Sequence, residues 1–369
     1  MEDIQSAREE AGLAEKESKQ KLSLLEARGA AQKLAFAPIV FQAVRTMWKR
    51  GILQRLADAG QGGISVKGVM AATNMSEYAV KVLLDMGESV EVVTRTDTGF
   101  EITTLGIMFL RDKMTQINMN FMHDTCYKAA FFLEESLVTG SPVGLQVFGN
   151  HKTVYEGLSK LPDDARESWF AFDHYYSDQV FPRALDKVLE NQPKTLLDIG
   201  GNTGRFARSC VRKNPDIEVT IVDLPGQLDA ARKEVKADGL EERIHFHETN
   251  ILNETPNLPY PIDAIWMSQF LDCFSKEEII SILKRTAKLL KPGGRIYIME
   301  LFPDLQAYEA AGYSLNATSL YFSFLANGNS RMYRSEDFFQ YIEDAGLEVE
   351  TSFNDIGGYH TLLTVKQSV

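Results

Sequence analysis

The second half of the chain alternates between short strand-like runs and helical runs, and this alternation constrains the fold more than any other feature. It begins after Gln192-Pro193-Lys194. The segments are 195–199, 206–213, 218–222, 228–237, 244–247, 264–267, 277–290 and 295–299. Alternating β and α segments predict a mostly parallel sheet with helices on both faces. We therefore expect a doubly wound α/β domain over residues 191–369.

A glycine-rich loop follows the first predicted strand. Asp198 ends the apolar run, and Gly200-Gly201-Asn202-Thr203-Gly204 leads into the next helix. Glycines let the backbone turn sharply and pass close to a ligand. Counted from Gly204, the next glycine of a dinucleotide pyrophosphate loop falls on Ala207, which disfavours that class of site. A purely structural turn is the alternative interpretation.

The second predicted strand ends on an acidic residue. Asp223 follows the run 218–222 and precedes Leu224-Pro225. A carboxylate at this place can accept hydrogen bonds from both hydroxyls of a ribose. Its separation from the first strand fits one βαβ unit. The alternative is a helix N-cap or a turn residue.

The first half of the chain has a different texture. Residues 1–33 are rich in Glu, Lys, Ala and Gln and contain no Pro, which predicts a helical arm. In 34–112, helical pieces at 52–59, 66–72 and 77–86 precede a strand at 90–93, a turn and a strand at 100–103, which is a winged-helix pattern. The third helix carries Glu77, Asp85 and Glu88 and is not basic, so this region favours dimerisation over DNA binding. Residues 113–190 are mainly helical and aromatic, and part of them is expected to line an apolar pocket for a small molecule.

Charge and cysteine content exclude several function classes. The formal net charge of −12, without a dense Lys/Arg cluster, disfavours nucleic-acid and anionic-membrane binding. Cys126, Cys210 and Cys273 are far apart and lack metal-ligand spacing, which indicates reduced thiols and no metal site. No apolar run has the length of a membrane span, and no signal-peptide pattern begins the chain. We expect a cytoplasmic protein.

Four stretches together resemble the class I methyltransferases that act on small molecules, such as the caffeic acid and hydroxyneurosporene O-methyltransferases. They are Leu197-Asp198-Ile199-Gly200-Gly201, Val222-Asp223-Leu224-Pro225, residues 289–295 (Leu-Leu-Lys-Pro-Gly-Gly-Arg) and Glu300. The likeness runs from about Ala35 to Lys366. The resemblance implies a Rossmann-like domain that binds S-adenosylmethionine and a homodimer formed through the winged-helix domain. It also implies methyl transfer to an aromatic or polyketide-like acceptor, most often at oxygen.

The same resemblance places the cofactor. Gly200 and the neighbouring backbone would contact the methionine moiety, and Asp223 the ribose. Asn250 stands where the family usually has an Asp near the adenine, and Asn202 replaces the usual third glycine of the loop. The full expected set is Asp198, Gly200, Gly201, Asn202, Gly204, Asp223, Leu224, Asn250, Ile251, Met267 and Ser268.

The expected catalytic residues depart from the family pattern. Asp272, in Phe270-Leu271-Asp272-Cys273-Phe274, replaces the His that usually removes the acceptor proton. A carboxylate can act as a base, especially where burial raises its pKa. Its alternative is to cap the helix that starts near Lys276, although Ser275 fits that cap better. Glu300 matches a family residue that orients the base, and Tyr333 replaces a second Glu.

Two further proton acceptors lie in the run 172–176, which matches a family helix on the acceptor pocket. They are His174 and Tyr176. Each could instead be a packed or surface side chain. Because the base is altered, nitrogen or carbon acceptors stay open. So do a family member with non-methylating chemistry, such as hydroxylation or decarboxylation, and a non-catalytic winged-helix regulator.

Overall fold

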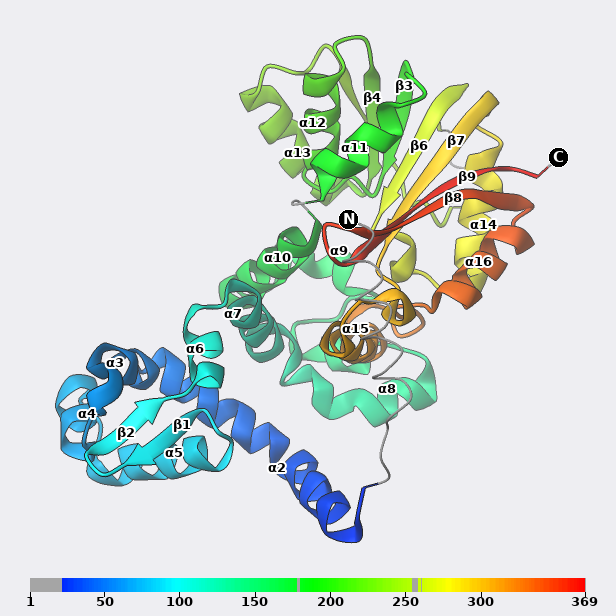
Figure 1. Ribbon diagram of the computed structural model, residues 1–369. Coiled ribbons are helices and arrows are strands. Elements are labelled where there is room, and N and C mark those ends of the chain that lie inside the picture. The colour runs from blue at the N-terminus through cyan, green and yellow to red at the C-terminus, as the bar shows by residue number, and fades with distance from the viewer. Residues whose placement is uncertain (1–21, 178–179, 254–257, 260, 369) are drawn as a thin grey trace, which may run out of the picture. The chain divides into compact units, whose positions relative to one another are not determined.

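The computed structural model describes residues 22–177, 180–253, 258–259 and 261–368, drawn in colour in Figure 1. Most of the predicted arm at 1–33 therefore lies outside the described residues. The chain divides into two compact units; the first ends at Met122 and the second begins at His123. The division into four regions expected from the sequence stays a prediction.

The first unit is a helical bundle with a short hairpin. Its elements are α2 (Leu24–Lys49), α3 (Ile52–Ala59), α4 (Val66–Thr73), α5 (Glu77–Ser89), β1 (Val93–Thr96), β2 (Gly99–Ile102), α6 (Thr104–Arg111) and α7 (Lys113–Asn120). Side-chain oxygens cap several helices by accepting backbone N–H bonds, as Ser65 does for α4 and Ser76 for α5. Met47, Leu53, Leu84 and neighbouring apolar residues close one core between α2, α3 and α5.

The hairpin starts three residues later than the sequence pattern indicates. Helix α5 runs on to Ser89, and the N–H groups of Val90 and Val92 still bond back to Met86 and Gly87. Glu91 takes a positive φ of 60°, which breaks any strand there. Local hydrogen bonding at the helix end therefore takes up residues that β-propensity alone assigns to the strand.

The second unit opens with short helices and continues into a large α/β layer. The first part holds a π-helical turn (Phe121–Cys126), 3₁₀ turns at Ala129–Phe132, Val143–Val147 and Leu158–Lys160, α8 (Leu133–Thr139), α9 (Val154–Gly157) and α10 (Asp163–Ser177). Then come α11 (Phe181–Leu189), α12 (Arg205–Lys213), α13 (Pro225–Ala237), α14 (Lys276–Ala287), α15 (Glu309–Tyr321) and α16 (Ser335–Asp344). A 3₁₀ turn at Pro303–Leu305 precedes α15 and a π-helical turn at Phe322–Ala326 follows it.

Seven strands form the sheet of this unit. They are β3 (Thr195–Ile199), β4 (Glu218–Asp223), β5 (Ile244–Glu248), β6 (Ile262–Ser268), β7 (Leu290–Glu300), β8 (Leu347–Ile356) and β9 (His360–Gln367). Their order is β5-β4-β3-β6-β7-β9-β8. Strands β3 to β7 pair in parallel, and β9 pairs antiparallel with both β7 and β8. The predicted doubly wound, mostly parallel sheet is confirmed.

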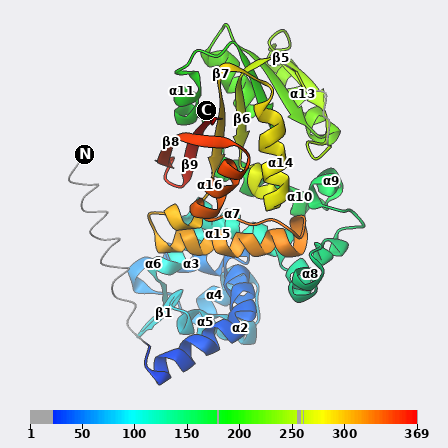
Figure 2. The same ribbon diagram turned by 90° about the vertical axis from the view of Figure 1, so that its right-hand side faces the viewer.

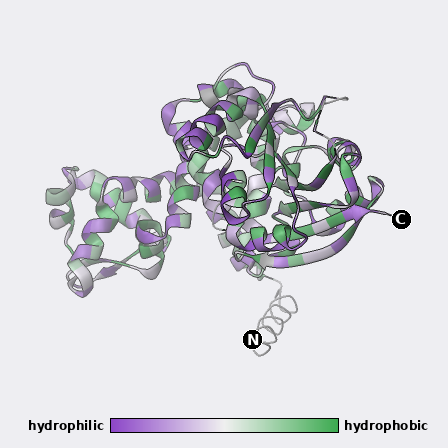
Figure 3. Ribbon diagram, turned by 90° about the horizontal axis from the view of Figure 1, so that it is seen from above, coloured by the Kyte–Doolittle hydropathy of each residue, from purple (hydrophilic) through white to green (hydrophobic). Residues whose placement is uncertain are grey.

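Helices cover both faces of the sheet. Figure 1 shows α11, α12 and α13 on one side and α14 and α16 on the other, and Figure 2 gives the view at right angles. Successive residues of a strand point to opposite faces, so Ile265 packs in the core under α14 and Trp266 in the core under α12. Hydrophobic and hydrophilic stretches succeed one another along the helices, as expected for one-sided burial (Figure 3). Among the described helices, none combines the length and apolarity needed to span a membrane.

The sheet has one switch point. From β3 the chain moves outward through β4 to β5, and then returns to lay β6 on the other side of β3. Connections leave β3 and β6 in opposite directions there, and sheets of this kind bind ligands outside the carboxyl ends of the strands at such a point. We call this region the crevice. The glycine-rich loop, Asp223, Ser268 and Glu300 all stand at these carboxyl ends.

Candidate active site

The loop after β3 adopts conformations that require glycine. Gly200 and Gly204 have φ of +76° and +73°. A Cβ at Gly200 would overlap the Phe270 ring, and one at Gly201 would come within 2.8 Å of the Asp198 carboxyl group. The N–H of Gly200 donates to the Val222 carbonyl at 2.9 Å, which ties the loop to β4. Glycine is therefore needed here both for the left-handed turns and because Phe270 and Asp198 pack directly against the loop.

Asp198 lies buried at the end of β3, beneath this loop. It is 2% exposed, and its Oδ2 has no hydrogen-bond partner among the described residues. Burial, with the charge of Asp223 nearby, raises the pKa of Asp198 to about 7. Burying a carboxyl group with an unsatisfied oxygen costs folding free energy, so Asp198 is better explained by a role in ligand binding than by a role in stability.

Asp223 is held rigidly at the end of β4. Its Oδ1 accepts the Leu224 N–H at 2.7 Å, and its Oδ2 accepts the Asn202 N–H at 2.9 Å. Burial raises its pKa to about 6, although these two bonds act in the opposite direction. Each carboxylate oxygen keeps a further lone pair, so two hydroxyls of a ribose can still donate to it.

The residues expected near the adenine lie after β5 and β6. Ile251 and Met267 are buried, and Asn250 is exposed. The Oδ1 of Asn250 accepts the Leu252 N–H at 2.9 Å, so its amide NH₂ is the group that can serve an adenine nitrogen. The Ser268 hydroxyl, at the end of β6, is buried without a hydrogen-bond partner among the described residues. Apolar side chains with one polar group suit a planar heterocycle.

Asp272 lies in a 3₁₀ turn, Leu271–Cys273, and is 6% exposed. Burial raises its pKa to about 7, and the charge of Asp173 acts in the same direction. It does not cap α14, because Ser275 accepts the Glu278 N–H and Glu278 accepts the Ser275 N–H in a complete capping box. The capping interpretation of Asp272 is therefore excluded, and its Oδ1 instead accepts the Cys273 thiol at 3.4 Å.

Glu300 holds the turn that carries Asp272. Its Oε1 accepts the N–H groups of Phe270 and Leu271 at 3.1 and 2.9 Å, while its Oε2 has no partner among the described residues. Burial, with the charge of Asp272, raises the pKa of Glu300 well above its ordinary value. Tyr333, where the family has a second Glu, donates its hydroxyl to the Phe274 carbonyl at 2.6 Å. Both residues position backbone, not the Asp272 side chain.

Aromatic side chains surround this turn. Tyr155 is hydrogen-bonded to the Cys273 thiol, and the charge of Asp272 helps to raise the pKa of Tyr155 well above its ordinary value, behind the larger effect of burial. Trp169, on α10, donates its Nε1–H to the Tyr321 hydroxyl at 2.8 Å. These groups make an apolar wall with a few polar atoms beside a buried carboxyl.

Helix α10 brings a residue to the site that the sequence analysis does not select. His174 stacks on Phe170 with ring centroids 5.9 Å apart, and Tyr176 packs among neighbouring aromatic rings. Asp173 is the group that reaches the loop, because its Oδ2 accepts the Asn202 amide N–H at 3.1 Å. The signal in the sequence is an acidic residue inside the run 172–176, directly before His174.

Five acids thus gather along the crevice, and their pKa values are all raised: Asp173, Asp198, Asp223, Asp272 and Glu300. Such a site disfavours anionic ligands and favours a ligand that carries positive charge. No group of three or more His, Cys, Asp or Glu among the described residues is arranged to hold a metal ion.

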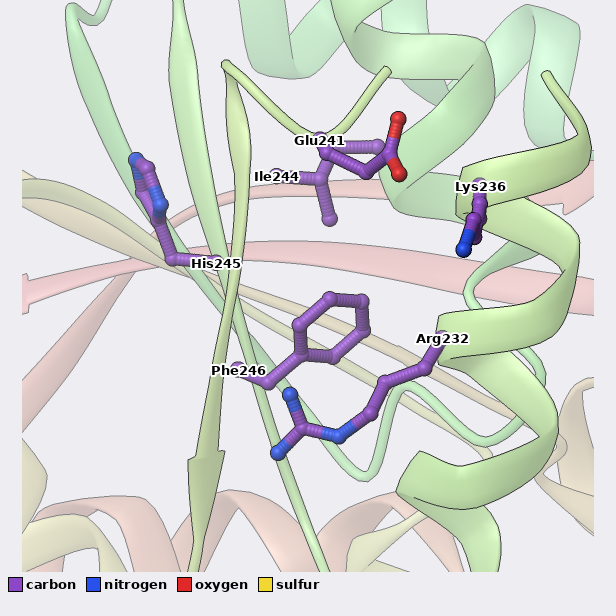
Figure 4. A pocket seen from close by; sticks show the side chains of 6 residues that line it. All are labelled: Arg232, Lys236, Glu241, Ile244, His245 and Phe246. Carbon is purple, nitrogen blue, oxygen red and sulfur yellow. The ribbon is translucent and has the colours of Figure 1, made fainter. Parts of the chain in front are cut away.

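A pocket lies elsewhere on the unit, between α13 and β5. This pocket of about 500 Å³ is lined by Arg232, Lys236, Glu241, Ile244, His245 and Phe246 (Figure 4). The Arg232 guanidinium stands 4.6 Å above the Phe246 ring and bonds to Glu248 at 3.0 Å. None of the expected site residues lines this pocket, and the side chains in Figure 4 do not converge on one point.

Comparison with known proteins gives two family matches. Residues 28–100 match the Dimerisation2-like domain, and residues 177–348 match the O-methyltransferase domain. L-tyrosine C(3)-methyltransferase of Streptomyces lavendulae is 23% identical over 323 residues, which cover 86% of each chain. Aclacinomycin 10-hydroxylase RdmB of Streptomyces purpurascens is 29% identical over 123 residues, 33% of this chain and 32% of that protein. The structure of mitomycin 7-O-methyltransferase MmcR has a TM-score of 0.70 at 19% identity and covers 93% of this chain and 98% of its own.

Proposed function

Because this chain belongs to the O-methyltransferase family that carries an N-terminal Dimerisation2-like domain, we propose that it transfers the methyl group of S-adenosylmethionine to a small aromatic or polyketide-like acceptor. The observation that carries the proposal is the pairing of Asp223 with the loop after β3. That carboxylate stands at the switch point and accepts the Asn202 N–H at 2.9 Å, which ties it to the glycine-rich loop.

The residues of the crevice fit this cofactor. Asp223 is placed for the ribose hydroxyls, with Leu224 next to it, and the backbone of Gly200, Gly201, Asn202 and Gly204 for the amino-acid end. Ile251, Met267, Asn250 and Ser268 would hold the adenosyl group. The unsatisfied Asp198 oxygen and the surplus of acids suit a ligand with an ammonium and a sulfonium charge.

When bound, the cofactor supplies a methyl group on a positively charged sulfur, which is already activated. The chain then has two tasks, to align the acceptor and to remove its proton. Asp272 is the base in this proposal, because burial makes its carboxylate more basic than an ordinary one and so a better match to a phenol. Glu300 fixes the turn that presents it, and His174 and Tyr176 are secondary candidates for the proton.

A phenol that loses its proton becomes nucleophilic at oxygen and at the ring carbons beside it. We propose transfer to oxygen. The relative named for C(3) methylation of tyrosine makes the ring carbon the specific alternative. The match to a hydroxylase over a third of the chain favours, as a second candidate, an enzyme that binds the same cofactor without methyl transfer.

We further propose that the first unit dimerises. Its α3–α5 helices followed by the β1–β2 hairpin support a winged helix. Apolar side chains stay exposed on it, among them Leu34, Phe36, Ile39 and Tyr78. A homodimer would remove this apolar surface from water. The three unpaired cysteines support a cytoplasmic location.

Calorimetry with S-adenosylmethionine and S-adenosylhomocysteine tests the cofactor, and a screen of phenolic acceptors tests the transfer. Asp223→Ala should weaken binding by at least about tenfold, because each hydrogen bond to a charged group is worth about 1.5–3 kcal/mol. Asp229→Ala, an exposed acid one turn into α13, is the matched control and should bind normally. Absence of binding to the wild-type chain would overturn the proposal, and binding without transfer to any acceptor would favour the second candidate.

A further inference from the structure

Asn202 is the one non-glycine residue of the loop after β3 with a positive φ, of 48°. Left-handed backbone costs ordinary residues about 1 kcal/mol, and glycine adopts it freely, while Asn visits it more readily than most side chains. A glycine would thus satisfy the backbone at this position. The presence of an amide side chain calls for a separate reason.

Asn202 makes two hydrogen bonds, and only the second of them needs the side chain. Its backbone N–H donates to Asp223 at 2.9 Å, which serves the nucleoside side of the crevice. Its side-chain Nδ2 donates to Asp173 at 3.1 Å, and Asp173 belongs to α10. The same residue therefore joins the carboxyl end of β4 to a helix that precedes the sheet in the chain.

Helix α10 is also part of the wall around Asp272. One turn before Asp173, Trp169 donates to the Tyr321 hydroxyl at 2.8 Å. The Asp173 carboxylate is close enough to Asp223, Asp272 and Tyr321 to raise the pKa of each, although burial is the larger cause in every case. The Asp173 side chain is 31% exposed, so it is partly buried and not sealed in the core.

We propose that Asn202 and Asp173 form a bridge that sets the position of α10, and with it the acceptor wall, from the cofactor loop. This inference rests on the proposed function, because it assigns the two sides of the bridge to cofactor and acceptor. Both are positioning residues: Asn202 acts through its amide on Asp173, and Asp173 through α10 on Trp169. Through this bridge, a ligand that fixes the loop conformation also reduces the mobility of the acceptor wall, and the reverse holds as well.

Hydrogen–deuterium exchange of the α10 amides tests the bridge without an acceptor. Asn202→Gly removes the amide while keeping the backbone N–H to Asp223 and a residue suited to positive φ. Because a hydrogen bond to a charged group is worth at least about tenfold in an equilibrium constant, α10 should exchange about tenfold faster in this variant. S-adenosylhomocysteine should slow α10 exchange in the wild-type chain and should no longer do so in Asp173→Ala, a substitution outside the residues assigned to the cofactor.

Two further variants distinguish loss of the bridge from nonspecific destabilisation of the fold. Asp173→Ala should behave as Asn202→Gly does, and Asp173→Asn, which keeps an acceptor oxygen, should restore most of the protection. Asn191→Ala is the matched control, since it removes a similar Asn bond of 3.1 Å to the Tyr297 hydroxyl. Its α10 exchange should equal that of the wild-type chain.

The outcomes are distinct. Unchanged ligand-free α10 exchange in Asn202→Gly overturns the bridge, and so does unchanged exchange in Asp173→Ala. If the wild-type chain does not bind S-adenosylhomocysteine, the proposed function fails. The ligand-free exchange of the four variants then decides the bridge by itself.

Discussion

Asp272→Asn should make the ligand-free protein more stable while it slows catalysis. Burial raises the pKa of Asp272 from 3.8 to about 7, so the folded chain holds a proton that the unfolded chain releases. The stability that this proton contributes is complete below pH 3.8 and is lost as the pH rises through about 7. Each tenfold change in proton affinity is worth about 1.4 kcal/mol, so the ionised carboxylate costs about 4 kcal/mol at pH 8. Asn keeps the shape of the side chain and has no charge to bury.

Thermal unfolding of the ligand-free protein at pH 8 and pH 5 is the assay. At pH 8 the variant should melt about 10 °C higher, since 1 kcal/mol moves the midpoint of a unit of this size by about 2–4 °C. At pH 5 the gain should shrink to less than half, because the wild-type carboxyl is then protonated. Turnover should fall by about 10²–10⁴-fold if Asp272 is the base. A variant that is no more stable than the wild-type chain at pH 8, or a gain independent of pH, would refute the reasoning.

Asp263→Asn, near the start of β6, is the matched control, and its effect on the free energy of unfolding should have the opposite sign to that of Asp272→Asn. Burial acts to raise the pKa of Asp263, but hydrogen bonds from Lys291 and Thr195 outweigh it and hold the pKa below its ordinary value. Its Oδ2 accepts bonds from Lys194, Thr195 N–H and Thr195 Oγ1–H at 2.9–3.0 Å. This variant should therefore lose stability at neutral pH.

Two further predictions concern the loop and the core. Gly200→Ala would force a Cβ into the Phe270 ring at a φ of +76°, so calorimetry should show binding of S-adenosylhomocysteine weakened by at least about tenfold. The control is Gly226→Ala on α13, where a Cβ meets nothing within 4 Å; it should bind normally and be slightly more stable. Equal affinities of the two variants would contradict the role of the loop. His360 is 1% exposed, and burial lowers its pKa from 6.5 to about 4. As the pH falls, the unfolded chain protonates His360 before the folded chain does, so the wild-type chain should lose about 3 kcal/mol of stability between pH 6.5 and 4. His360→Leu should not show this loss, and urea unfolding at both pH values measures the difference. Parallel pH profiles of the two chains would count against the prediction.

Features set by neighbours in the chain could be predicted from the sequence. The alternation of segments predicted the parallel sheet, and the residues at the ends of β3 and β4 predicted the loop and the carboxylate that the structure places together. Ser275 and Glu278 form the capping box that their spacing indicates. Such features depend on periodicity and on hydrogen bonds within one or two turns, which residue order alone controls.

Only the tertiary structure decided which distant groups meet. The amide of Asn202 reaches Asp173, 29 positions earlier, and Glu300 holds the turn that carries Asp272, about 30 positions before it. The hairpin β8–β9 and its antiparallel place beside β7 were likewise not visible in the pattern. Burial of Asp173, Asp272 and Glu300 raises the pKa of each, and that burial exists only once the sheet and helices have closed around them. Residue order fixes which chemical groups are available, and the packed chain fixes the distances and the desolvation that make them reactive.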